Sequence, residues 1–212
     1  PGPPTAEPAG APPEPEPADE EPGAARCFQI QNSYIVEERA DGIAIIDQHA
    51  LHERILFNSI RDRIGRARLE SQRLLVPAVV ELGKADAAGL LAEQETLAVL
   101  GIELSEFGPD SVAVNALPAV LSRQDPAAVV HDLLAELSGD LRSSPVEARK
   151  LAMAKRIACK AAVKAGDRLT PSEMRSLLER AQQIGERDTC PHGRPTCIVL
   201  PYEDLERQFE RK

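Results

Sequence analysis

The chain has 212 residues, 42% of them hydrophobic, which is enough for one larger domain or two small ones. No apolar run approaches the roughly 20 residues that a membrane helix needs, and no apolar signal segment follows a basic start, so we expect a cytoplasmic protein without a membrane span. The four cysteines show no paired framework. In a reducing compartment, clustered Cys and His indicate a metal or catalysis more often than disulfides.

The net charge of −9 is unevenly distributed. Residues 1–26 carry six acids and one base, a net of −5, which leaves −4 for residues 27–212. Phosphate neutralisation supplies most non-specific affinity for DNA, so this composition predicts a poor DNA binder on its own. If DNA is the substrate, another component must help to deliver it.

Residues 1–25 hold nine of the 18 prolines, alternating with Ala and Glu. Such a segment cannot bury a core, and it predicts an extended, disordered linker. The chain begins with Pro rather than Met, which indicates a fragment of a longer protein whose missing domain precedes the linker.

Order is expected from about residue 26. The segment Phe28–Val36 is rich in β-formers, and Asp41-Gly42 is a turn signal before a second strand that ends at Asp47. A helix is expected over about 48–63. One side of this helix aligns four residues spaced by four, three and four: His49, Glu53, Leu56 and Ile60.

The middle of the chain, 67–145, has the pattern of a separate α+β unit. It contains the apolar run 74–76, an Ala/Leu-rich helix near 84–100, strands near 102–107 and 112–117, and a helix from Pro126. A basic helix follows near 146–165, and Thr170-Pro171-Ser172-Glu173 is a strong helix start. The end is a loop over 190–195, a strand over 196–200 and a last helix ending near Phe209.

These elements predict a two-lobed fold of the α/β (α+β) class. Residues 26–66 and 146–212 form one unit with a mixed sheet and helices, and residues 67–145 form an inserted unit.

His49 and Glu53 lie four residues apart and therefore share one helix face. A surface hydrogen bond is the simpler interpretation of this pair. The face continues into Leu56 and Ile60, however, so it is expected to pack inward, where an unpaired carboxylate is costly. Asp47 adds a second carboxylate just before the helix.

Cys190 and His192 are two residues apart in a loop stiffened by Gly and Pro, which directs both side chains to one side. Thiolate and imidazole are a ligand pair suited to zinc. A buried Cys beside a surface His explains the spacing equally well. Cys159, in an Ala-rich helix, is by itself an ordinary core cysteine.

Three motifs occur in order: Asp47-Gln48-His49-Ala50-Leu51-His52-Glu53, Ala158-Cys159-Lys160, and Cys190-Pro191-His192-Gly193-Arg194-Pro195. Together they resemble the endonuclease motifs in the C-terminal domain of MutL, the DNA mismatch repair family, over about residues 26–212. The resemblance implies a composite site whose metal ligands are His49, Glu53, Cys159, Cys190 and His192. It also implies that Glu53 bridges two ion positions and that Asp47 is an acidic residue needed for activity.

The chemistry of phosphodiester cleavage agrees with such a site, because paired ions can stabilise both the attacking and the leaving oxygen. Cys and His ligands favour zinc in a regulatory or structural role, whereas hard phosphate oxygens favour manganese or magnesium for catalysis. One position departs from the family: its first motif continues to an acidic residue where this chain has Asn58.

The segment Gln72-Arg73-Leu74-Leu75-Val76-Pro77 resembles the family's sliding-clamp-binding segment. A Gln followed by aliphatic residues in an extended strand suits insertion into a hydrophobic groove. An ordinary strand entering the middle unit is the alternative, and the resemblance favours the clamp. The proposed clamp contacts are Gln72, Leu74, Leu75, Val76 and Pro77.

Basic residues cluster around Cys159, among them Lys155, Arg156 and Lys160. A solvated helix face is the usual reason for such a run, and contact with the DNA backbone is the functional alternative.

The resemblance implies a homodimer that acts on double-stranded DNA near the bacterial nucleoid, together with a MutS-type mismatch-recognition protein. ATP would bind only to the absent N-terminal part, since this chain has no Gly-rich phosphate loop.

We therefore predict a metal-dependent nicking endonuclease and dimerisation domain. The main alternative is a non-catalytic dimerisation module with at most a structural zinc. A third interpretation, a clamp-binding adapter without chemistry, depends on residues 72–77 alone.

Overall fold

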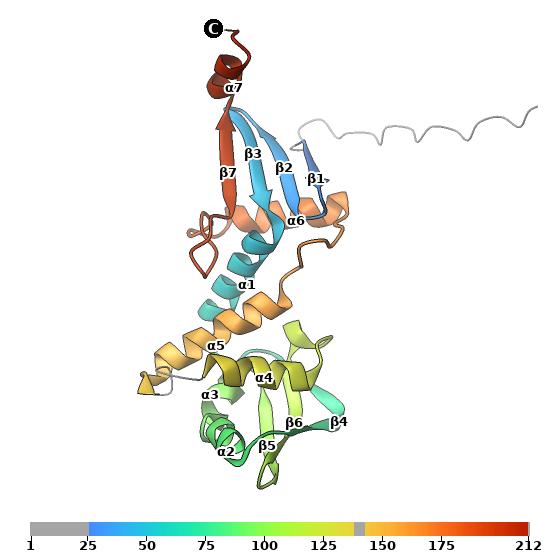
Figure 1. Cartoon of the computed structure of the whole chain (residues 1–212), viewed down its shortest axis with the longest axis vertical. Helices are drawn as coiled ribbons and strands as arrows, with labels where there is room; N and C mark the ends of the chain where they lie inside the picture. The colour runs from blue at the N-terminus through green and yellow to red at the C-terminus, as the bar shows by residue number, and fades with distance from the viewer. Residues whose placement is uncertain (1–25, 138–142, 212) are drawn as a thin grey trace, which may run out of the picture.

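The computed structural model describes residues 26–137 and 143–211 as an elongated molecule with two sheets, one near each end (Figure 1). The predicted linker over residues 1–25 lies outside the described residues. Helices and strands are mixed along the chain, so the predicted α+β class is confirmed. Among the described residues, no helix has both the length and the apolarity to cross a membrane.

The first sheet has the strand order β1-β2-β3-β7, and every neighbouring pair is antiparallel. The prediction of a mixed sheet is therefore wrong, because β7 returns antiparallel to β3. The strands are β1 (Cys27–Ile30), β2 (Tyr34–Arg39), β3 (Gly42–Asp47) and β7 (Cys197–Pro201).

The segment expected as one strand over 28–36 is two strands joined by a turn. Gln31 and Asn32 occupy the turn with φ values of 51° and 46°, a conformation that Asn tolerates and Gln rarely adopts. At the far end of the sheet, a Cβ on Gly42 would lie 2.3 Å from the carbonyl oxygen of Leu200. The close approach of β3 and β7 therefore requires glycine at that position.

One face of this sheet is covered by α6 (Pro171–Gln182) and by the first half of α1 (Gln48–Ile64). Helix α6 begins with the expected capping box, in which Thr170 and Glu173 bond each other's backbone. The buried residues of this first core are Ile35, Ala44, Ile46, Leu51, Ile55, Met174, Leu177, Leu178 and Ala181.

Within residues 26–137 and 143–211, no element covers the other face of the sheet, which is apolar. Strand register places Phe28, Val36, Ile45 and Ile198 in one row across all four strands, and Phe28 and Ile198 are each 58% exposed. We call this row and its apolar neighbours Ile30, Tyr34, Ile43 and Leu200 the outer face. An open apolar sheet face of this kind is typical of an interaction surface.

The second sheet has the order β4-β6-β5 and is also antiparallel. It comprises β4 (Ser71–Glu81), β5 (Glu103–Gly108) and β6 (Ser111–Pro118). Around it lie α2 (Lys84–Ala92), α3 (Gln94–Val99), the 3-10 turn η1 (Ala119–Leu121), α4 (Pro126–Glu136) and α5 (Val146–Ala161). The chain closes with α7 (Tyr202–Gln208).

The second core takes residues from outside the predicted inserted unit. Phe57 and Ile60 of α1, together with Met153 and Ile157 of α5, are buried in it. Helix α1 therefore contributes its first half to one core and its second half to the other. The chain boundaries at 66 and 145 remain predictions, and the packing shows that α1 joins the two parts.

Candidate metal centre

Helix α1 begins where the sequence pattern predicts, and Asp47 is its N-cap. The Oδ1 atom of Asp47 accepts a hydrogen bond of 2.9 Å from the backbone N–H of Ala50. This bond satisfies one of the free N–H groups at the helix start. The structure thus gives Asp47 a local role in fixing α1, beside the role in activity that the resemblance implies.

Glu53 lies one and a half turns into α1 and is completely buried. Among the described residues, neither of its carboxylate oxygens has a hydrogen-bond partner. Oε1 lies 2.9 Å from Nδ1 of His192, and this contact is an ion pair when the imidazole is protonated. A buried carboxylate without hydrogen bonds is costly to keep ionised unless a positive charge faces it.

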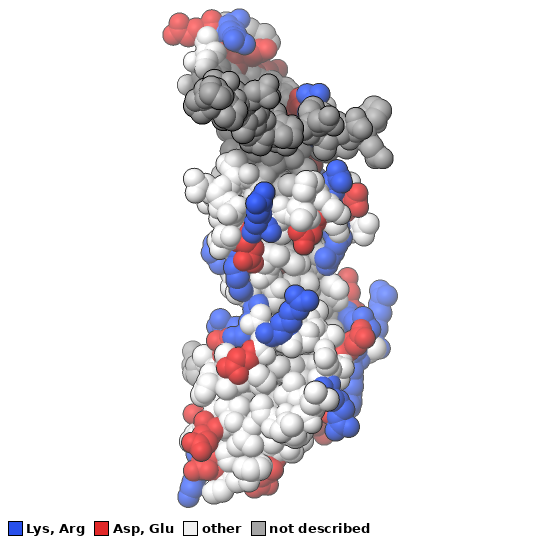
Figure 2. All heavy atoms as spheres, turned by 90° about the vertical axis from the view of Figure 1, so that its right-hand side faces the viewer, with Lys and Arg blue, Asp and Glu red and all other residues white. Residues whose placement is uncertain are grey.

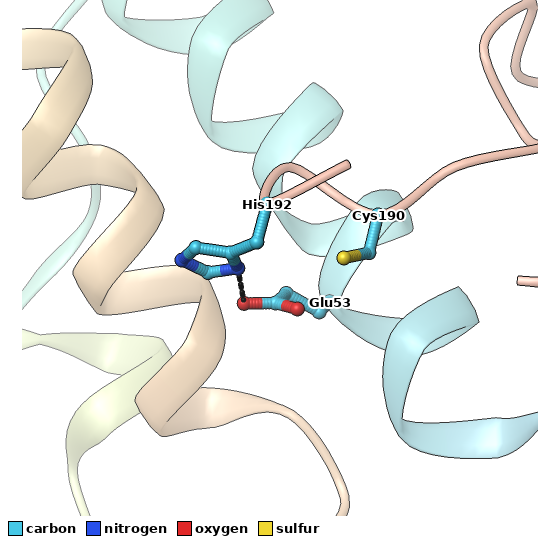
Figure 3. A group of neighbouring side chains, drawn as sticks. All are labelled: Glu53, Cys190 and His192. Carbon is cyan, nitrogen blue, oxygen red and sulfur yellow. Dashed lines mark ion pairs between the residues drawn. The ribbon is translucent and has the colours of Figure 1, made fainter. Parts of the chain in front are cut away.

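The loop after α6 presents two further donor atoms to Glu53. Cys190 is buried and His192 is partly exposed, and both side chains point toward Glu53 (Figure 3). One donor atom from each of the three residues lies within 4.8 Å of the others. The structure therefore brings together three of the five predicted ligands, from α1 and from a loop almost 140 residues later.

The loop has a defined internal structure. The N–H of Cys190 donates to the carbonyl of Arg194 at 2.7 Å, and the N–H of Gly193 donates to the carbonyl of Cys190 at 2.9 Å. Gly193 has φ of +82°, which glycine adopts without strain. A bridge between Thr189 and Pro195 closes the loop at its base. This tight turn fixes Cys190 and His192 on the same side.

Cys159, on α5, lies beside the group of three without belonging to it. Burial first, and then the negative charge of Glu53, raises the pKa of the Cys159 thiol. Zinc could bind this sulfur only after displacing its proton.

His49 is turned toward the chain between α5 and α6. Its Nδ1 lies 2.7 Å from the carbonyl oxygen of Val163. A carbonyl can only accept, so Nδ1 carries the proton and Nε2 keeps its lone pair. The ring is thus in the tautomer that leaves one nitrogen available as a ligand, although His49 is not among the three residues already converged.

His52, for which the sequence predicted no role, bonds to the backbone N–H of Val163, the residue whose carbonyl contacts His49. Its Nδ1 accepts a hydrogen bond of 3.1 Å from the N–H of Val163. Burial, reinforced by Arg180 and His49, lowers the pKa of His52 to about 4, so the ring is neutral near pH 7 and can accept. Two imidazoles of α1 therefore hold Val163 from both sides.

Two other polar residues of α1, Gln48 and Arg54, have roles that sequence reasoning missed. Gln48 is fully buried; its amide donates to the carbonyls of Asn32, Lys164 and Asp167 and its oxygen accepts from Gln29. It joins the β1–β2 turn to the chain after α5. Arg54 likewise joins α1 to a distant segment, the loop over residues 189–196.

Arg54 anchors the loop that carries Cys190 and His192. It is 7% exposed, and its guanidinium donates to the carbonyls of Thr189 and Cys190, the latter at 2.9 Å. Glu186 accepts from it at 3.2 Å. Because Arg54 follows Glu53 directly, the same helix turn supplies the carboxylate and holds the loop that faces it.

Asn58, where the family pattern has an acid, is buried on α1, and its Oδ1 has no hydrogen-bond partner among the described residues. It is not one of the three converging donors. This position therefore lies outside the group of three donors.

The predicted clamp segment lies on β4, an edge strand of the second sheet. Gln72 is paired with Leu117, but the register shifts between Arg73 and Ala78, and Leu74 packs partly on the second core. Leu75 is fully exposed and Val76 is 78% exposed. Two adjacent aliphatic side chains therefore project from a strand edge into solvent, next to Pro77.

Two of the three predicted DNA-backbone residues are engaged in ion pairs. Arg156 lies 2.9 Å from Glu136, and Lys160 is paired with Asp132; both acids belong to α4. These pairs fasten α5 to α4 and offset the positive charges that the sequence pattern made conspicuous.

The fold and this donor group define an α+β domain with two cores, an open apolar sheet face and a candidate metal centre on the shared helix. Residues 27–169 match the family model of the MutL C-terminal dimerisation domain, and the chain belongs to this family.

The chain is similar to three DNA mismatch repair proteins MutL. Identity is 39% over 190 residues for that of Chelativorans sp. (strain BNC1), 38% over 197 residues for that of Phenylobacterium zucineum, and 40% over 190 residues for that of Paramagnetospirillum magneticum. These alignments cover 90%, 93% and 90% of this chain, but only 30%, 32% and 31% of the relatives. The chain therefore spans about a third of the length of the curated relatives it matches.

Replacing Arg54 by Ala removes three anchors of the 189–196 loop and is expected to destabilise the protein by about 1–3 kcal/mol, because buried acceptors lose their donor. Hydrogen exchange of the loop should accelerate more than that of α6. Arg61→Ala is the matched control, since Arg61 reaches Glu186 at 3.4 Å from a more exposed position and, among the described residues, does not bond to the loop backbone. Equal exchange rates in the two variants would contradict an anchoring role.

Proposed function

We propose that this chain is the metal-dependent nicking endonuclease and dimerisation domain of a MutL-like mismatch repair protein. The observation that carries the proposal is the buried Glu53 carboxylate, which has no hydrogen-bond partner among the described residues and faces Cys190 and His192. A scaffold without a metal has no evident need for a buried acid and a buried thiol that converge with an exposed imidazole.

The residues that would hold metal are Glu53, Cys190 and His192, with Cys159 beside Glu53 and His49 on the same helix. Sulfur and nitrogen donors suit zinc, and a carboxylate suits manganese or magnesium as well. When bound, a divalent ion supplies Lewis acidity toward a phosphodiester. We propose both kinds of ion, zinc and manganese or magnesium, for this same set of donor residues.

The protein's own contribution is to place these donors before any ion arrives. Arg54 holds the loop, the carbonyl of Val163 sets the tautomer of His49, and the Asp47 cap fixes the start of α1. Bonds of this kind orient ligands and tune their basicity. Among the three converging donors, Glu53 supplies the only carboxylate, and its negative charge would be shared by the proposed ions.

Nicking of supercoiled plasmid in the presence of manganese is expected from the unchanged chain and should be lost in Glu53→Lys. The substitution puts a positive charge where the proposed ions would be shared. The dimer should persist, because the outer face is untouched. Low salt and added sliding clamp are appropriate, since DNA affinity is largely electrostatic and the chain is acidic.

Glu95→Lys makes the same charge reversal at an exposed position on α3 and should nick normally. Zinc content of all three proteins is measured in parallel. Equal nicking by the unchanged chain and Glu53→Lys would identify a contaminating nuclease. Absence of nicking by the unchanged chain, with metal bound and clamp present, would favour the alternative of a dimerisation module with a structural zinc.

The outer face supports the proposal of a homodimer, because four apolar residues from four strands form one row, exposed at Phe28 and Ile198 and half-buried between them. Ile198→Asp is expected to convert the dimer to a monomer, since a charge would be buried at the contact. Sedimentation or light scattering gives the mass. Leu75→Asp, on the other sheet, should leave the mass unchanged. A dimer that survives Ile198→Asp would place the contact elsewhere.

The exposed pair Leu75 and Val76 supports the proposal that β4 binds a sliding clamp. Replacing both by Ala removes the aliphatic groups that would enter a hydrophobic groove, so affinity should fall at least tenfold, on the order of 1.5 kcal/mol or more. Zinc content and dimer mass should not change. Calorimetry with the clamp measures the effect, and Val120→Ala, at another exposed apolar position, is the control. Undiminished affinity would make β4 an ordinary edge strand.

DNA as substrate, a MutS-type protein as partner and ATP binding by a preceding domain are proposals on the same basis. They follow from membership of the family and from relatives about three times as long as this chain.

A further inference from the structure

The segment from the last turn of α1 through the connection into the start of β4, residues 61–73, is a second basic segment besides α5. Residues 61–73 contain five arginines and two acids, Asp62 and Glu70, a net of +3 in a chain whose net charge is −9. Figure 2 shows several Lys and Arg side chains along one edge of the molecule, from its waist down over the part that holds the second sheet.

The two basic segments differ in how their charges are paired. On α5, four cations have acidic partners within 3 Å: Arg149 with Glu93, Lys150 with Glu147, Arg156 with Glu136 and Lys160 with Asp132. In the 61–73 segment, only Arg61 has acidic neighbours among the described residues, Asp62 at 3.6 Å and Glu186 at 3.4 Å. The exposed arginines 63, 66, 68 and 73 form no ion pair within residues 26–137 and 143–211. Their charge is available to an external anion.

The backbone beneath these arginines is held in place. The N–H groups of Arg66 and Ala67 both donate to the carbonyl of Arg63, at 2.9 and 2.8 Å. The N–H of Leu69 donates to the carbonyl of Val99 at 2.9 Å and ties the connection to the end of α3. The side chains therefore extend from a fixed turn, which lowers the entropic cost of holding a ligand.

Two of the arginines share a concave surface. Arg68 and Arg73 line a hollow of about 260 Å³ together with the polar side chains of Gln94 and Asn115. Glu103 is the acid on the same wall. Two guanidinium groups with amide neighbours are donors of the kind that bind phosphate oxygens.

The position along α1 relates this surface to the candidate metal centre. Arg63 follows Glu53 by ten residues on the same helix, which corresponds to about 15 Å along the axis. That length equals the rise of roughly four base pairs of duplex DNA. A duplex running beside α1 would thus reach the arginines within half a helical turn of the metal centre.

From these observations we infer that Arg63, Arg66, Arg68 and Arg73 form a contact surface for the phosphate backbone of double-stranded DNA. The inference rests on the proposed function for its substrate. A protein partner is less suited to the site, because four separate, unpaired guanidinium groups along an extended segment match a repeating anion better than one acidic patch.

The test is DNA affinity measured by fluorescence anisotropy with a labelled duplex over a series of salt concentrations. Arg63, Arg66 and Arg68 are changed together to Gln; Arg73 is kept because it lies in the clamp segment. Each lost phosphate contact lowers the slope of log affinity against log salt by about 0.9, so the slope should fall by about 2.7. The comparison variant changes Lys150, Arg156 and Lys160 to Gln, an equal loss of charge from paired positions, and should leave the slope nearly unchanged.

Thermal unfolding establishes that both variants fold. The anisotropy assay needs neither bound metal nor cleavage, so its outcome is independent of the nicking test. A lower slope in the first variant alone supports the surface. Equal losses in both variants would show an effect of net charge and would overturn it. It would also be overturned if the α5 variant lost more, if the unchanged chain bound no DNA at the lowest salt, or if the first variant lost clamp affinity while its DNA affinity stayed the same.

Discussion

Helix α1 is packed into two hydrophobic cores at once, and the parts of the candidate site are fixed relative to it. Leu51 and Ile55 lie in the first core, and Phe57 and Ile60 lie in the second. Glu53 sits between these anchors and cannot turn to solvent without disturbing both. A helix with free ends could release such a carboxylate to water, whereas α1 holds it inside, where a facing positive charge would stabilise its ionised form.

The same constraint explains why neighbouring polar residues of α1 reach in different directions. Gln48, His52 and Arg54 each bond to backbone groups that lie more than 100 residues later in the chain. Gln48 also bonds to Asn32 in the turn between β1 and β2. Buried polar groups are retained when their bonds are made, and here they attach the α5–α6 connection and the 189–196 loop to the shared helix. The motif is thus as much a set of structural attachments as a set of donors.

Much of this arrangement could be predicted from the chain alone. The helix from 48, the capping box at Thr170 and the pairing of Cys190 with His192 follow from local spacing, which determines the face or the turn a residue occupies. The turn at Gln31 and Asn32 was missed because it contains no Gly or Pro. The direction of β7 could not be predicted, since its partner β3 lies about 150 residues earlier.

The tertiary roles of single side chains were also beyond local patterns. Nothing near Arg54 in sequence indicates that it reaches Thr189, and nothing near Lys160 indicates that Asp132 offsets its charge. Composition gives the number of charges; only packing decides which of them are paired. For that reason the basic helix α5 was the more conspicuous candidate for DNA contact in the sequence. In the structure, the arginines at the end of α1 and after it are more available to an external anion, because the cations of α5 are paired with acids.

Strand β7 lies at the edge of its sheet and is held by one ladder of hydrogen bonds, to β3. It carries Ile198 of the outer face and follows directly on the loop with Cys190 and His192. Edge elements open at lower free energy than central ones, and residues on one such element open together. The loop and the end of the outer face therefore belong to one local unfolding unit. Anything that clamps β7 from the outer side, such as a second copy of the chain, also reduces the time that the two donor residues spend away from Glu53.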